Sequence, residues 1–125
     1  MHITLPLELH SSKNSQQIVT LRNGKRMLIK SIYARRQDKI LDVLLPANKR
    51  IWDKMKEGKE YPLKVGFFVY RKTKRRWDVL NILQGAADAM TRHGYWPDDN
   101  VNYFIPVFLG WAVDSKNPRC EVTIL

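Results

Sequence analysis

The sequence predicts an α/β (α+β) fold in which a small mixed β-sheet packs against two or three helices. Residues 2–9 alternate apolar and polar side chains, which is typical of a half-buried strand, whereas residues 78–92 repeat apolar side chains at helical spacing. The apolar stretches 101–113 and 119–125 then close the chain as two long strands. Since 125 residues can bury one core but not two ordinary ones, we expect a single domain over residues 1–125.

The N-terminal part is expected to hold an edge strand and a hairpin. Pro6 interrupts the alternating pattern, and proline is tolerated mainly in edge strands or at bends because it cannot donate a backbone hydrogen bond. Residues 11–17 are polar and typical of a loop. Residues 18–21 and 27–29 then flank an Asn-Gly pair at 23–24, the dipeptide most typical of a tight hairpin turn.

The middle of the chain is expected to be helical and then to return to a strand. Residues 31–45 place apolar side chains near helical spacing, and we expect Pro46 to end this helix. A second helix is predicted over residues 47–57. Residues 61–70 are rich in aromatic and β-branched side chains, so they predict a strand. Gly94 suits the position just beyond the next helix, where a left-handed conformation is needed.

The net charge is the most unusual feature of the composition. The chain has 22 Lys and Arg residues against 12 Asp and Glu, a formal charge of +10. A positive field attracts polyanions, so nucleic acid is the first partner to consider. The lone Cys120 excludes an internal disulfide. We find neither a secretory signal nor an apolar stretch long enough to cross a membrane, so we expect a cytoplasmic protein with no membrane partner.

A run of cationic side chains directly precedes the helix at 78–92. It consists of Arg71, Lys72, Lys74, Arg75 and Arg76. Each cation that neutralises a phosphate releases condensed counterions, so this run predicts salt-dependent DNA binding, with a solvated strand end as the alternative. The nearby aromatic residues Trp77, Tyr95 and Trp96 have two interpretations as well. One is that these rings stack on unpaired bases, and the other is that they anchor the helix in the core. Core packing is favoured for each residue taken singly.

Carboxylates lie on both sides of the same helix. Asp78 is in its N-terminal turn, and Asp98 and Asp99 follow the helix. Mg²⁺ prefers oxygen ligands, and phosphodiester hydrolysis often uses such ions held by a few Asp or Glu side chains. These groups can meet if the chain after the helix runs back along it; otherwise Asp78 is a helix N-cap and the Asp98-Asp99 pair forms a turn. Asp88 lies about 15 Å from Asp78 along the helix, so we do not expect the two to share a metal ion.

In this order and spacing, these residues resemble the signature of the RusA family of Holliday-junction resolvases. That signature runs from basic residues through D-x-D-N-x-x-K to D-A-[LM], a glycine and a D-D pair. The chain matches it with Asp78, Asn81, Asp88-Ala89-Met90, Gly94 and Asp98-Asp99. The N-terminal strand, the polar loop after it and the closing pair of strands agree as well, so the resemblance covers most of the chain.

The resemblance implies a dimeric endonuclease, encoded by a phage or prophage and acting in the bacterial cytoplasm. Such an enzyme binds branched double-stranded DNA at four-way junctions, in recombination and repair, and nicks two strands symmetrically with Mg²⁺, or with Mn²⁺ in its place. It implies that Asp78, Asp98 and Asp99 are catalytic and that Asp78 and Asp99 are metal ligands. Asn81 is then a supporting polar group, and Gln84 joins the five cations in DNA binding.

Two positions depart from the family signature. Leu80 replaces its second Asp, and Gln84 replaces its Lys. Leucine cannot ligate a cation, and glutamine cannot neutralise charge on a phosphate; loss of one such stabilising group can cost on the order of 100- to 1,000-fold in rate. Either Glu8, Asp114 or Glu121 supplies the missing ligand, or cleavage is lost.

The sequence therefore predicts a RusA-like protein that binds branched DNA, with its Mg²⁺-dependent cleavage weakened or lost. The alternative is a non-catalytic module that binds DNA or another protein in phage replication or recombination. The apolar, aromatic residues 103–111 suggest this alternative because they suit contact with a partner, although they equally suit a dimer face. A general RNA-binding protein is a third interpretation, which no motif of its own supports.

Overall fold

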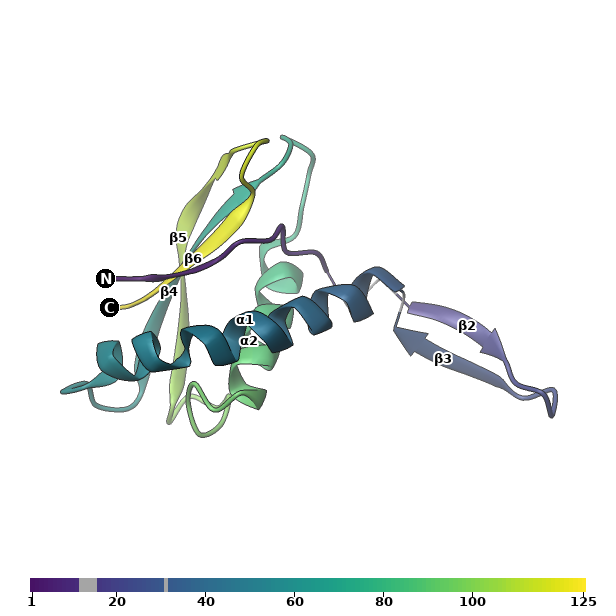
Figure 1. The fold of residues 1–125 in the computed structure, drawn as a ribbon, viewed down its shortest axis with the longest axis horizontal. Helices are drawn as coiled ribbons and strands as arrows, with labels where there is room; N and C mark the ends of the chain where they lie inside the picture. Colours follow the sequence, from purple (N-terminus) through teal and green to yellow (C-terminus); the bar gives the residue numbers. More distant parts are fainter. Residues whose placement is uncertain (12–15, 31) are drawn as a thin grey trace.

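The computed structural model describes residues 1–11, 16–30 and 32–125. Within these ranges the elements are β1 (Ile3–Leu5), β2 (Gln16–Thr20), β3 (Arg26–Lys30), α1 (Ile32–Lys56), β4 (Leu63–Arg71), α2 (Val79–Arg92), β5 (Phe104–Val113) and β6 (Arg119–Ile124). The β2–β3 hairpin extends away from the other elements at the N-terminal end of α1 (Figure 1). No helix in the described ranges is long and apolar enough to cross a membrane.

In the described part of the chain, four strands form a mixed sheet in the order β1-β6-β4-β5. β4 and β5 are parallel, whereas β6 pairs antiparallel with both β1 and β4. β1 is therefore an edge strand, as Pro6 predicts, and β5 forms the opposite edge. The crossover between the parallel strands β4 and β5 contains α2. This mixed sheet with its helices confirms the predicted α+β class.

The core lies between one face of this sheet and the helices. Leu63, Val65, Phe67 and Val69 alternate along β4 and are buried, whereas Lys64 on the other face is exposed. The remaining strands and both described helices add further apolar side chains, among them Ile3, Leu5, Leu41, Leu45, Trp52, Ile82, Ala86, Met90 and Val122. Burial of such surface contributes about 25 cal/mol per Å² and is the main term that stabilises the fold.

A group of buried aromatic side chains joins α1 to the segment after α2. The rings of Trp52 and Tyr95 are 5.2 Å apart, and Trp96 stacks on Phe104 with 4.1 Å between ring centroids. The Trp52 indole N–H donates to the Tyr95 carbonyl, and the Trp96 indole N–H donates to the Thr91 hydroxyl. Burial raises the pKa of the Tyr95 hydroxyl well above its usual value. The predicted core role of Tyr95 and Trp96 is confirmed.

α1 continues through Pro46, so the prediction that the helix ends there is wrong. A proline in a helix interior removes one hydrogen bond and costs about 3 kcal/mol. Pro46 lies on the exposed side of α1, while Leu41, Leu45 and Trp52 on the other side are buried. The Tyr95 hydroxyl also donates to the Leu45 carbonyl at 2.7 Å. Packing on both sides of the proline therefore outweighs the local preference, and the two predicted helical segments are one helix.

The predicted β-hairpin is present. β2 pairs antiparallel with β3, and Gly24 at the tip has a φ of 82°. That left-handed conformation carries little cost only for glycine, which explains the Asn-Gly signal. Residues 12–15 of the predicted polar loop and residue 31 of the predicted first helix lie outside the described residues.

Candidate functional site

Asp78 forms the N-cap of α2, one of the roles predicted for it. One of its carboxylate oxygens accepts hydrogen bonds from the backbone N–H groups of Leu80 at 3.1 Å and Asn81 at 3.5 Å. The Asn81 side-chain amide donates to the other oxygen at 3.2 Å. The helix dipole stabilises a negative charge at this position. At its other end, α2 is followed by Gly94 with a φ of 75°, as predicted.

A pocket of about 350 Å³ opens between α2 and β5, and Asp99 lies on its wall. We call it the Asp99 pocket; it is lined by Phe67, Leu80, Leu83, Gln84, Ala87, Asp88, Asp99, Phe104 and Pro106. Leu80, Gln84 and Asp88 are four residues apart, so they follow one another along one side of α2. The pocket thus brings Asp99, from the segment after α2, to the side of the helix that carries both departures from the signature.

Leu80 is in this pocket without being part of the core. Its side chain is 79% exposed, and Gln84 and Asp88 beside it are also exposed. A leucine at such a position gains little from burial. Core packing therefore does not require an apolar residue at position 80, and a carboxylate there would be solvated.

The carboxylates near α2 differ in their surroundings. Asp88 and Asp99 line the Asp99 pocket, whereas Asp98 belongs to a turn: its oxygens accept from the Asp99 backbone N–H at 2.8 Å and the Asn100 amide at 3.1 Å. Within residues 1–11, 16–30 and 32–125, no group of three or more His, Cys, Asp or Glu side chains is arranged to hold a metal ion. Mg²⁺ is commonly bound through one or two carboxylates plus substrate phosphates and waters. Asp78 is not among the residues described as lining this pocket, so the structure brings Asp88 and Asp99 to it but not the cap of α2.

The three acids considered as replacement ligands make contacts elsewhere. The Glu8 carboxylate accepts a hydrogen bond from the backbone N–H of Lys72. Asp114 and Glu121 form ion pairs with Arg119 at 2.9 Å and 3.2 Å, and hydrogen bonding from Arg119 lowers the pKa of Asp114. These three acids are not among the residues described as lining the Asp99 pocket. None of them supplies a third carboxylate there.

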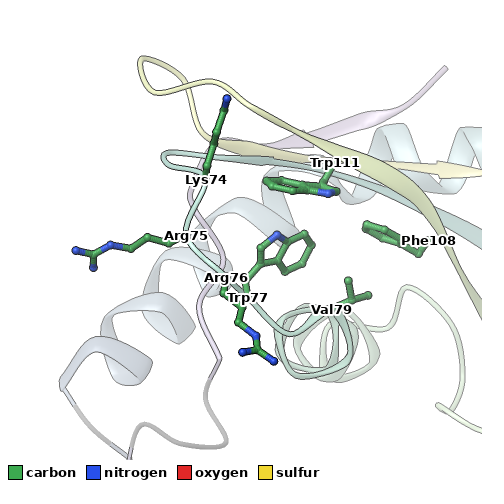
Figure 2. Close-up of a pocket in the computed structure, with 7 residues that line it drawn as sticks. All are labelled: Lys74, Arg75, Arg76, Trp77, Val79, Phe108 and Trp111. Atoms are coloured by element: carbon green, nitrogen blue, oxygen red, sulfur yellow. The ribbon is translucent and has the colours of Figure 1, made fainter.

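A second pocket, of about 270 Å³, lies where the cationic run meets β5 (Figure 2). We call it the Trp77 pocket; it is lined by Lys74, Arg75, Arg76, Trp77, Val79, Phe108 and Trp111. The Trp77 ring lies 5.9 Å from the Phe108 ring and 5.7 Å from the Trp111 ring, edge to face with both. The pocket therefore combines a group of aromatic rings with a rim of cations, and its described lining contains no acidic residue.

A β-bulge places Phe108 and Trp111 in the same pocket. In a regular strand, residues three apart point to opposite faces. The pairing of β5 with β4 shifts between Phe108 and Gly110, which leaves Leu109 as the extra residue. Gly110 has a φ of 133°, a conformation that favours glycine. The Leu109 side chain lies against Gly66 instead of entering the Trp77 pocket.

The five predicted DNA-binding cations differ in their surroundings. The Arg71 guanidinium donates to the Leu9 carbonyl and lies 5.3 Å from the centre of the Trp77 ring, so it also supports the end of β4. The other four, Lys72, Lys74, Arg75 and Arg76, are exposed. The guanidinium groups of Arg75 and Arg76 extend away from the aromatic rings (Figure 2). The rim of the Trp77 pocket thus presents positive charge outward.

Sequence reasoning misses Phe108, Trp111 and Asp88 as members of a site. The signal for the first two is Gly110, because a glycine inside an apolar strand often marks a bulge. The signal for Asp88 is its helical spacing from Leu80. From the sequence, Asp88 is compared only with Asp78, which is far from it along α2. That comparison does not address whether Asp88 and Asp99 line the same pocket.

Comparison with known proteins adds a finding on family. A family model described as endodeoxyribonuclease RusA matches residues 11–125. No curated protein is similar enough to this chain to match it. The matched range contains α2, β5 and both pockets, so the family match and the geometry concern the same part of the chain.

Proposed function

Because this chain belongs to the RusA family of endodeoxyribonucleases, whose function is Holliday-junction resolution, we propose that it binds four-way DNA junctions and that its cleavage is weakened or lost. Residues 1–125 would form one RusA-like domain in each copy of a homodimer. A two-fold dimer matches the two-fold symmetry of a junction. We place the protein in the bacterial cytoplasm, in DNA recombination and repair linked to a phage or prophage.

The proposal is carried by one observation: both departures line the same pocket as Asp99. Where the family signature has a carboxylate and a lysine, this chain presents Leu80 and Gln84. Preorganised charges at a reacting phosphate commonly account for several kcal/mol of transition-state stabilisation. The loss of two such groups from one pocket, which Glu8, Asp114 and Glu121 do not line, would therefore lower the cleavage rate more than it lowers affinity for DNA.

RusA endonucleases are generally dependent on divalent metal ions. We propose that Asp78 and Asp99 act as ligands to Mg²⁺ or Mn²⁺, that Asp98 is the third catalytic residue, and that Asp88 adds a carboxylate to the Asp99 pocket. When bound, the ion supplies an activated water and stabilises charge on the phosphate. Because Leu80 contributes no ligand atom, we expect this site to hold the ion weakly until a DNA phosphate completes it.

The cationic run supplies the affinity for the DNA backbone. Lys72, Lys74, Arg75 and Arg76 are exposed beside the N-terminus of α2, at one end of the border between α2 and β5. Phosphate contacts of this kind give affinity and set the position of the protein on DNA without reading sequence. Gln84 would then contact the backbone near the Asp99 pocket through its amide.

The test is a comparison of a synthetic four-way junction with a duplex of matched sequence, at physiological salt and with Mg²⁺ or Mn²⁺. We expect preferential binding to the junction and little or no paired nicking. Robust paired nicking that Asp99→Asn abolishes would show that catalysis survives and would reject the loss of cleavage. Equal affinity for junction and duplex would reject the junction-binding function itself.

A second candidate function is a module that contacts another protein. The observation that favours it is β5, a 10-residue edge strand without a charged residue, in which Phe108, Leu109, Trp111 and Val113 are exposed. Exposed apolar edges of this kind are often covered by a partner. If the purified protein binds junction, duplex and single-stranded DNA with equal, weak affinity, this second function is favoured.

A further inference from the structure

We infer that the Trp77 pocket takes an unpaired nucleobase of single-stranded or branched DNA. The inference rests on the proposed function, because that function supplies the DNA, and it deepens it by assigning a ligand to a pocket distinct from the Asp99 pocket. Its basis is the chemistry of the walls, the size of the pocket and the direction of the surrounding charges.

The aromatic walls that β5 contributes are left exposed by the fold, whereas Trp77 also packs against the core. Phe108 and Trp111 remain 39% and 42% exposed, although each contacts the Trp77 ring. Neither Trp77 nor Trp111 has a hydrogen-bond acceptor for its indole N–H among the residues that the structure describes, unlike the buried Trp52 and Trp96. A nucleobase presents both a flat π face and ring acceptors, so it matches these unused groups.

The volume of the pocket suits one small planar group. At about 270 Å³, it lies below the range of roughly 300–1,000 Å³ that is typical for drug-sized ligands. The β-bulge is what closes it, because Trp111 would otherwise point to the other face of β5. Phe108 and Trp111 of β5 and Trp77, whose ring contacts both, therefore line the pocket together (Figure 2).

The charges around the pocket are placed for a nucleotide rather than for an isolated aromatic group. Lys74, Arg75 and Arg76 line its rim, and the two guanidinium groups point outward into solvent (Figure 2). A base stacked on the exposed surface of these rings would leave its phosphates at this rim. Aromatic side chains combined with a positively charged groove are the usual means of binding single-stranded nucleic acid.

A second copy of this chain is the rival occupant of the same surface. Across a two-fold axis, it would bring another Lys74, Arg75 and Arg76 close to the first set, with no acidic residue in the described lining to neutralise them. Like charges brought together at an interface oppose association. DNA supplies negative charge at the same place, so the pocket favours a nucleotide.

The experiment compares two short oligonucleotides of equal length, one of thymidine nucleotides and one of abasic nucleotides, by fluorescence anisotropy at fixed salt. Both carry the same phosphates, so their difference in affinity reports the bases alone. We expect the wild-type protein to bind the base-containing strand on the order of tenfold more tightly. Trp111→Leu, and independently Phe108→Leu, should bring this ratio close to one and leave the affinity for the abasic strand unchanged.

The matched control is Leu109→Ala. Leu109 is 44% exposed on the same strand, but it faces away from the Trp77 pocket. This variant should keep the wild-type ratio. Thermal melts of each variant should show a folded protein, as expected for changes at exposed positions.

Several outcomes would overturn the assignment. One is an equal affinity of the wild-type protein for both strands; another is a ratio that survives both Trp111→Leu and Phe108→Leu. If that equal affinity is found and sedimentation shows that Trp111→Glu separates a dimer into monomers, the surface belongs to a second copy. If the protein prefers junctions to duplex but binds both single strands equally, this pocket assignment is rejected and the proposed function stands. If it prefers the base-containing strand but binds junction and duplex equally, the proposed function is rejected and the pocket assignment stands.

Discussion

The Asp99 pocket lies between α2 and β5, whereas the Trp77 pocket lies where the cationic run meets β5, and the two contain opposite chemistry. The first places Asp88 and Asp99 beside an exposed leucine, whereas the second surrounds aromatic rings with cations. The Trp77 pocket has both the cations that suit phosphate contact and the aromatic rings that suit base contact. The Asp99 pocket lacks the third carboxylate and the lysine that the family signature has for phosphate cleavage. If the proposed function holds, this difference predicts that affinity for DNA and cleavage of DNA depend on separate residues, so that each can be changed without the other.

The largest effect is expected from a residue that supports one pocket without lining either. Trp96 is buried and stacks on Phe104, which lines the Asp99 pocket. Trp96→Ala should lower the free energy of unfolding by about 3–5 kcal/mol, because it leaves a cavity in the core. Urea denaturation measures this loss. Trp111→Ala is the matched control and should cost under about 1 kcal/mol; equal losses would show that the exposed tryptophan is as structural as the buried one.

The next largest effect concerns the Asp99 pocket. Leu80→Asp combined with Gln84→Lys should raise junction cleavage on the order of 100-fold or more, because both changes restore charge where a phosphate would react. The exposure of both side chains means that the core should tolerate the change. Rates of paired nicking with Mg²⁺ measure the gain, and adding Asp99→Asn should remove it. Unchanged cleavage in the double variant would mean that more than these two positions has diverged.

The same contrast explains how much the sequence reveals. α2 and the β-hairpin are predicted correctly because their signals, the cap at Asp78 and the glycines at 24 and 94, act on residues close in sequence. The helix end at Pro46 is predicted wrongly because packing of Leu45 and Trp52 against distant residues decides it. Local preference is a guide only where tertiary packing does not oppose it.

The two pockets differ in the same way. Leu80 and Gln84 are recognised from the sequence because a linear motif contains them. The Trp77 pocket is not, because Phe108 and Trp111 share it only through a bulge set by the pairing of β5 with β4. A shift of one residue in a strand moves a side chain to the other face. The sequence therefore shows which cations and aromatic residues are present, but it does not predict that they line one pocket.

A smaller effect separates the cations from the aromatic residues. Arg75→Ala with Arg76→Ala should weaken binding to junction, duplex and abasic strand alike, on the order of tenfold, and should reduce the slope of affinity against salt by about two. Titrations at several salt concentrations measure both. Lys59→Ala with Lys64→Ala removes the same charge at a different pocket and should leave the slope almost unchanged. An unaltered slope in the arginine variant would exclude phosphate contact at these positions.

The smallest effect is expected at the C-terminal end of α2, opposite the N-cap Asp78. Asp42 of α1 accepts hydrogen bonds there from His93 at 2.7 Å and Arg92 at 2.9 Å. These contacts lower its pKa below the usual value of an aspartate, first through the hydrogen bond from His93 and then through that from Arg92. Because the folded-state pKa is the lower one, the stabilisation is present above the unfolded pKa and is lost as pH falls through the folded pKa.

Asp42→Asn should therefore lower the free energy of unfolding at neutral pH by under about 1 kcal/mol, a small value because the Asp42 side chain is 48% exposed and screened by solvent. Urea titrations of both proteins across the acidic range measure the difference, which should vanish once the pH is below the folded pKa of Asp42. A difference that stays constant down to that pH would assign the effect to packing instead of charge. DNA affinity should not change, because Asp42 lines neither of the two pockets within the described residues.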